Sequence, residues 1–151
     1  TINGAKLKLQ AKPYMTVLEV LRREGFLGVK NGCSEGICGS CTILVDKMPR
    51  KSCLMFIGQI KDRMVTTIEG LGTPKDPHPL QEAFVEEAGI QCGFCIPGMI
   101  LSAYSLLERI SCPSELEIKQ ALAGHLCRCT GYVKQIKAVK KAAKRLRKEI
   151  D

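Results

Sequence analysis

The chain has 151 residues, of which 45% are hydrophobic and 25% are charged. This composition is typical of a globular protein with one domain or two small ones, and it excludes a disordered or fibrous chain. The formal net charge is +8, but eight of the 23 Lys and Arg residues lie within 134–148. The charge therefore belongs to one segment and does not by itself indicate a nucleic-acid-binding protein.

Nine cysteines in a chain of this length raise the question of disulfides. A secreted disulfide scaffold would need an export signal, and no apolar segment of that kind follows a charged N-terminal region. No apolar run approaches the length of a membrane span either. We therefore expect a cytoplasmic protein, without a membrane segment, whose clustered cysteines bind metal.

The N-terminal part of the chain predicts strands around one short helix. Thr1–Gly4 predicts a hairpin turn, and the alternation of Lys and Leu at 6–9 predicts its second strand. Thr16 and Glu19 have the spacing of a capping box, which opens a helix that ends at Gly25. Further strands are predicted at 42–45, at the segment that carries Cys53 and at 65–68. The fold class is therefore α+β, beginning with a ferredoxin-like domain of the β-grasp type.

The first cysteine set consists of Cys33, Cys38, Cys41 and Cys53. The spacing C-x4-C-x2-C with a distant fourth cysteine is typical of a plant-type [2Fe–2S] cluster. Glycines at 32, 36 and 39 suit a loop that curls around a cluster, since glycine reaches positive φ and has no Cβ. A zinc site is the alternative, but zinc sites usually present two compact cysteine pairs, so the spacing favours iron–sulfur.

A proline-rich linker and four helices complete the chain. Three prolines fall within the linker at 73–79, which separates a domain at 1–72 from a second domain at 80–151. Apolar periodicity and capping signals predict helices at 80–88, from Pro97 to Ile110, from Ser114 to Gly124, and from Tyr132 to the end. Helices this short bury little alone, so we expect a four-helix bundle held partly by a metal centre.

The second cysteine set lies between these helices and consists of Cys92, Cys95, Cys127 and Cys129. Loops at the same end of a bundle can converge, so these four thiols can form one site. From spacing alone, zinc and a [2Fe–2S] cluster both remain open.

The sequence around both sets resembles a known family. Gln91-Cys-Gly-Phe-Cys-Ile-Pro-Gly-Met99 and Cys127-Arg-Cys-Thr-Gly-Tyr132 closely resemble the iron–sulfur subunit of the xanthine oxidase family of molybdenum hydroxylases. The loop from Gly32 to Cys41 is also similar to that family's N-terminal loop, and the likeness covers essentially the whole chain. Two departures are Ile96, where the family often has Thr, and Gln135, which interrupts a usually apolar position.

The resemblance implies an electron-transfer subunit with two [2Fe–2S] clusters, one on each cysteine set. It further implies that Gln91 hydrogen-bonds the molybdopterin cofactor, in its dinucleotide form, of a large catalytic subunit, and that Cys92 lies near the pterin. Electrons would then pass from molybdenum through both clusters to FAD on a medium subunit. The chain would be part of a hetero-oligomeric oxidoreductase and would carry no catalytic residue itself. The sequence agrees, since it contains no nucleotide-binding glycine motif and no nucleophile–base set.

Two alternative functions, and two interpretations of the basic segment, stay open at the level of sequence. The protein could be a free-standing ferredoxin-like carrier or a zinc-stabilised interaction module. The basic segment 134–148 could be a solvated helix face or a docking surface for an acidic partner; nucleic-acid binding is disfavoured because interleaved aromatics are missing. Cys112 is the ninth cysteine, and we expect a structural or free thiol there.

Overall fold

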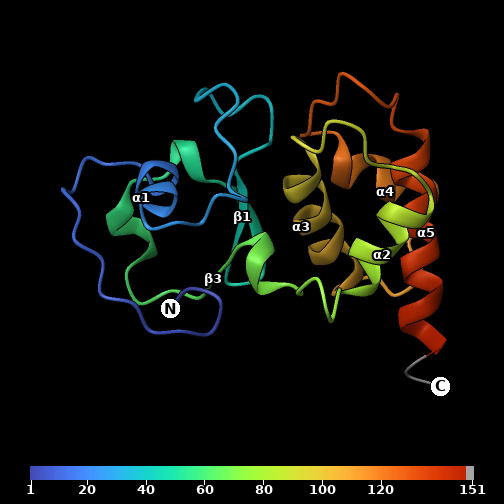
Figure 1. The fold of residues 1–151 in the computed structure, drawn as a ribbon, viewed down its shortest axis with the longest axis horizontal. Helices are drawn as coiled ribbons and strands as arrows, with labels where there is room; N and C mark the ends of the chain where they lie inside the picture. The colour runs from blue at the N-terminus through green and yellow to red at the C-terminus, as the bar shows by residue number, and fades with distance from the viewer. Residues whose placement is uncertain (149–151) are drawn as a thin grey trace.

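The structure is a computed structural model that describes residues 1–148. Figure 1 shows a sheet with helix α1 (Val17–Arg23) in one half and helices α2 to α5 in the other. The sheet consists of β1 (Thr42–Val45), β2 (Met48–Lys51) and β3 (Val65–Thr66), in the order β2-β1-β3. Both pairings are antiparallel, and Leu44 of the buried central strand lies opposite Pro49 on one side and Thr66 on the other.

Helix α1 begins as predicted, at a capping box. The Thr16 hydroxyl accepts from the Glu19 N–H at 3.2 Å, and the Glu19 carboxylate accepts from the Thr16 N–H at 2.7 Å. Its apolar side is buried against the sheet half, whose core contains Ile2, Val17, Leu18, Leu21, Val29, Cys41, Ile43, Val45, Cys53, Ile60 and Val65. The first half of the chain therefore folds around a small core that includes two of the predicted ligands.

Three of the strand predictions need correction. Residues 6–9 form no strand, because the turn before them is closed only by an isolated bridge between Ile2 and Ala5 and the pairing does not continue beyond it. Cys53 lies in a 3-10 helix, Ser52–Leu54, instead of a strand. The strand predicted at 65–68 spans only Val65–Thr66, and a 3-10 helix at Ile68–Gly70 follows it. The β-grasp arrangement accordingly stays a prediction.

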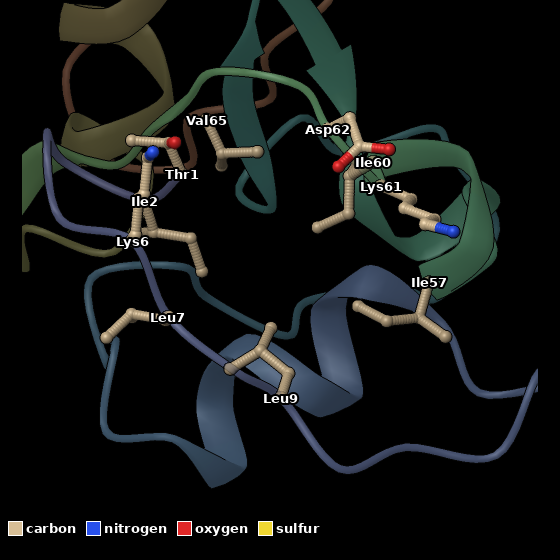
Figure 2. Close-up of a pocket in the computed structure, with 10 residues that line it drawn as sticks. All are labelled: Thr1, Ile2, Lys6, Leu7, Leu9, Ile57, Ile60, Lys61, Asp62 and Val65. Carbon is tan, nitrogen blue, oxygen red and sulfur yellow. The ribbon is translucent and has the colours of Figure 1, made fainter.

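The unpaired N-terminal segment borders a pocket with a volume of about 570 Å³. Figure 2 shows Lys6, Leu7 and Leu9 on one side and residues of the 3-10 helix Ile57–Ile60 on the other. None of the predicted cysteine ligands is among the residues that line this pocket. It therefore belongs to the scaffold of the first half and not to the thiol sites.

The second half contains helices α2 (Pro79–Glu86), α3 (Ile96–Leu107), α4 (Glu115–Leu122) and α5 (Val133–Lys148), one for each predicted helix. The Ser114 capping box opens α4 as predicted. The chain turns after α2 at Ala88, which has a φ of 50°, one residue before the predicted stop at Gly89. Residues 149–151 of the last predicted helix lie outside the described residues. The domain boundaries at 72 and 80 stay a prediction.

Helix α3 joins the two halves, because it lies against β1 of the sheet (Figure 1). A Cβ built on Gly98 of α3 would lie 2.5 Å from the carbonyl oxygen of Gly39, so the backbones approach too closely for a larger residue. Lys47 and Glu108 form an ion pair of 2.9 Å across the same boundary. This packing places the first cysteine loop next to the helical half.

Three basic side chains of helix α5, those of Lys140, Lys141 and Arg145, form ion pairs with acids of the same chain. Lys141 contacts Glu86 at 3.0 Å and Glu87 at 2.8 Å, and Arg145 contacts Glu86 at 2.6 Å. These contacts favour the interpretation of a solvated face that stabilises the packing of α5 on α2. No helix in the described part of the chain is long and apolar enough to span a membrane.

Candidate iron–sulfur sites

The first cysteine loop directs backbone N–H groups at the sulfur of Cys33. The N–H groups of Glu35 and Cys38 both donate to Cys33 Sγ at 3.4 Å. Gly36 and Gly39 have a φ of +77°, as predicted for a loop of this kind. Gly32 does not adopt positive φ, but a Cβ there would lie 2.8 Å from Cys38 Sγ. Gly32 is therefore needed because the Cys38 sulfur lies close to its backbone, and not because of positive φ. The prediction gave both reasons for all three glycines without distinguishing them.

Two thiols of the first set, Cys33 and Cys53, differ in how readily they ionise. Hydrogen bonds from the N–H groups of Cys38 and Glu35 lower the pKa of Cys33 to about 7. Burial, followed by the neighbouring Cys41 thiol, raises the pKa of Cys53 to about 11. Two adjacent buried thiols resist losing both protons unless a cation compensates the charge, and a metal centre provides that cation.

The second set is built from two loops that the helices bring together. Cys92 Sγ lies 3.6 Å from Cys129 Sγ. Burial, followed by the Cys127 thiol, raises the pKa of Cys95 to about 12. Burial also opposes ionisation of Cys127, but hydrogen bonds from the Thr130 hydroxyl and the Cys129 N–H outweigh it and lower the pKa of that thiol. The thiols thus associate crosswise, the first with the fourth and the second with the third.

These pairings fit a [2Fe–2S] cluster, which needs two protein ligands on each of two irons. The chain offers such pairs in each set: Cys33 with Cys38, Cys41 with Cys53, Cys92 with Cys129, and Cys95 with Cys127. The residues therefore fit two-iron clusters.

The other predicted site residues lie at the surface of the second loop. Gln91 and Cys92 are both exposed just before α3, and Phe94 beside them is 45% exposed. An exposed Gln91 is free to contact a group on another chain, but its cofactor role stays a prediction. Cys112 is also exposed and lies outside both thiol sets.

Sequence reasoning missed the role of Gln135, which it treated as an interruption of an apolar face. The side chain is fully buried, and its Nε2 donates to the Gly89 carbonyl at 2.8 Å and to Thr130 Oγ1 at 2.6 Å. Gly89 precedes Cys92, and Thr130 directly follows Cys129. Gln135 therefore ties together the two loops of the second set. The sequence did contain a signal for this role: a polar residue stands at a helix position that faces the core, close to the loop with Cys127 and Cys129. A buried polar side chain is expected to have hydrogen-bond partners.

Sequence reasoning also missed a direct connection between the two sets. The Leu126 N–H donates to the Cys38 carbonyl at 2.9 Å, and Lys51 Nζ donates to the Gly124 carbonyl. Cys38 of the first set is thereby one hydrogen bond from the neighbour of Cys127, a thiol of the second set. Beside this bond His125 is buried, with Nε2 2.7 Å from Ser102 Oγ. Burial and the Lys51 ammonium lower the pKa of His125 to about 4, so its ring is neutral at pH 7.

Comparison with known proteins gives the same assignment for both halves. A family described as "2Fe-2S iron-sulfur cluster binding domain" matches residues 1–60, and one described as "[2Fe-2S] binding domain" matches residues 67–140. The nicotinate dehydrogenase small FeS subunit of Eubacterium barkeri is 41% identical over 145 residues, which cover 95% of this chain and 92% of the relative.

Two larger proteins contain a segment similar to most or all of the chain. Xanthine dehydrogenase 1 of Arabidopsis thaliana is 46% identical over 144 residues, covering 87% of this chain but 11% of that protein. The structure of the aldehyde oxidoreductase from Desulfovibrio gigas superposes with a TM-score of 0.95 and 38% identity, covering 99% of this chain and 17% of that one. With two matching [2Fe–2S]-binding domains and a relative of nearly equal length, the chain belongs to the small iron–sulfur subunits of the xanthine oxidase family of molybdenum hydroxylases, which are oxidoreductases.

Proposed function

We propose that this chain holds two [2Fe–2S] clusters and is the electron-transfer subunit of a heteromeric molybdenum hydroxylase. The observation that carries this proposal is the presence of two complete sets of four thiols, each associated in pairs, in one chain. The ligands of the first cluster would be Cys33, Cys38, Cys41 and Cys53, and those of the second Cys92, Cys95, Cys127 and Cys129. A β-grasp domain at 1–72 and a helical domain at 80–151 would each hold one cluster.

When bound, such clusters supply one-electron transfer. The chain tunes and connects them through its own groups. The N–H groups of Glu35 and Cys38 stabilise the Cys33 thiolate, and Thr130 does the same for Cys127. The hydrogen bond from Leu126 N–H to the Cys38 carbonyl gives a continuous covalent and hydrogen-bonded connection between ligands of the two sets. This connection suits a chain that relays electrons between its halves.

The partners are proposed from the family and from the exposure of the second loop. A large subunit would carry molybdopterin in its dinucleotide form next to Gln91 and Cys92, and a medium subunit would carry FAD. The relative from Eubacterium barkeri is named the small FeS subunit of nicotinate dehydrogenase, and the chain covers most of its length, which supports a small chain within a larger assembly. A free-standing carrier would not need the second thiol set.

EPR spectroscopy combined with metal analysis tests the proposal. The full chain is purified anaerobically, reduced with dithionite and examined at low temperature together with C41S, C95S and the control C112S. We expect two distinct signals and about four irons per chain, loss of a different signal in C41S and C95S, and both signals in C112S. One signal with about two irons would reduce the protein to a single-cluster carrier. A silent sample that contains zinc would overturn the proposal.

A further inference from the structure

The imidazole of His125 lies where the two thiol-bearing halves meet. It is 3% exposed, and Nε2 is 2.7 Å from Ser102 Oγ on α3. On the other side the ring faces Gly39 in the first cysteine loop, where a Cβ would lie 2.6 Å from Nδ1. Among the described residues Nδ1 has no hydrogen-bond partner of good geometry. The ring therefore bridges α3, the first cysteine loop and its own loop.

The backbones around this ring approach one another unusually closely. A Cβ on Gly98 would lie 2.5 Å from the Gly39 carbonyl oxygen and 3.2 Å from His125 Cε1. Beside the ring, the Leu126 N–H donates to the carbonyl of Cys38, the residue before Gly39. Any shift of the ring would move Gly39 or α3, and with them the loops that carry the ligands.

A metal-ligand role does not explain this histidine. Each set already has four thiols, and Nε2 is engaged by Ser102. A neutral imidazole offers one donor and one acceptor on opposite sides of a rigid ring. That suits a spacer between the Ser102 hydroxyl and the Gly39 backbone. The Tyr132 hydroxyl further anchors the loop, since it donates to the His125 carbonyl at 3.1 Å and accepts from the Cys127 N–H at 2.7 Å.

We propose that His125 is a positioning residue that fixes the spacing between the two thiol sets, and thereby the magnetic coupling of the two clusters. This inference rests on the proposed function, because the coupling exists only if both clusters are present. The contact with Ser102 holds the ring against α3, and the contact with Gly39 holds the first loop against the ring.

Low-temperature EPR of the full, cluster-loaded chain measures this spacing. In fully reduced protein each cluster is a paramagnet that splits or broadens the signal of the other, and partly reduced samples give the uncoupled line shapes. H125L replaces the ring with an apolar side chain of similar bulk. S102A removes the hydroxyl that contacts the ring and leaves the ring itself in place. H125Q restores a hydrogen-bond donor and an acceptor at this position. The matched control is S105A on the same helix, whose buried hydroxyl has no partner within the described residues.

We expect the splitting of the EPR signals by magnetic coupling to be no longer resolved in H125L and to be weaker in S102A. It should recover in part in H125Q, and S105A should match the parent. Hydrogen exchange of the peptide that contains Leu126 provides a second readout. Its amide should exchange several-fold faster in H125L, because the bond to Cys38 is no longer held at one spacing.

The outcomes separate this inference from the proposed function. A parent protein without two signals refutes the function, and the inference with it. Two intact signals whose coupling and Leu126 protection are unchanged in H125L refute the inference alone. If H125L does not retain its clusters, S102A decides, because unchanged coupling and exchange in that variant would also overturn the role assigned to His125.

Discussion

Replacement of Gln135 by leucine tests whether this buried side chain supports the second thiol set. Leucine has nearly the same size, so the substitution keeps the volume and removes the hydrogen bonds from Nε2 to Gly89 and Thr130. It also removes Oε1, which has no hydrogen-bond partner among the described residues. The variant thus changes polar contacts without creating a large cavity.

The magnitude follows from these three groups. Two hydrogen bonds contribute about 0.5–1.5 kcal/mol each, so their loss lowers the free energy of unfolding by about 1–3 kcal/mol. Removal of a buried acceptor that lacks a partner returns about 1 kcal/mol. We therefore expect Q135L to be up to about 2 kcal/mol less stable than the parent. The loss is local, since both acceptors lie beside loops of the second set.

The assay follows the loss of each EPR signal after an iron chelator is added to the loaded protein. We expect the second cluster to be lost several-fold faster in Q135L and the first at an unchanged rate. Gln120 is exposed on α4, so Q120L is the control and should match the parent. Equal rates for both clusters in Q135L, or faster loss of the first, would refute the assignment of Gln135 to the second site.

Three further predictions concern the scaffold. Met99 is fully buried in the helical core, so M99A should cost about 2–5 kcal/mol in a denaturation experiment, and M99L less than about 1.5 kcal/mol. G98A should lower the thermal midpoint although alanine favours helices, because its Cβ meets Gly39, whereas G58A has open space and should be neutral. K141Q should lower stability at low salt, and the difference should shrink at high salt. Lys141 lowers the pKa of Glu87 below its ordinary value of 4.5. The difference in stability between K141Q and the parent should therefore disappear as the pH falls below 4.5 and then below the lowered pKa, because Glu87 becomes protonated.

Local signals allowed the helices to be predicted better than the strands. The capping boxes at Thr16 and Ser114 are made within four residues, so the sequence contains every atom that they need. A strand depends on a partner that is distant in sequence. The alternation at 6–9 is a genuine strand pattern, but the pairing at the preceding turn stops at the isolated bridge between Ile2 and Ala5. Strand patterns without a visible partner are therefore the weaker predictor in this chain.

The grouping of the cysteines into two sets could be predicted because several members of each set lie at short intervals in one loop, although their role as ligands stays a prediction. The contacts between the sets could not. The bond from Leu126 to Cys38 joins residues that are far apart in sequence, and it uses only backbone atoms, which every residue possesses. Its formation depends on close approach of Gly39 to Gly98, and a glycine in a sequence does not reveal what it approaches.

Gln135 and His125 have different predicted roles: Gln135 supports retention of the second cluster, and His125 supports the coupling between the two clusters. Gln135 contacts both loops of the second set and no part of the first, so its loss should affect retention of the second cluster alone. His125 lies between the second set and the first loop, so its loss should alter coupling while both clusters remain bound. If each substitution produced both effects, the two sites would form one cooperative unit. If the effects separate, the chain consists of two independently held clusters whose spacing is set by a third, distinct group of contacts.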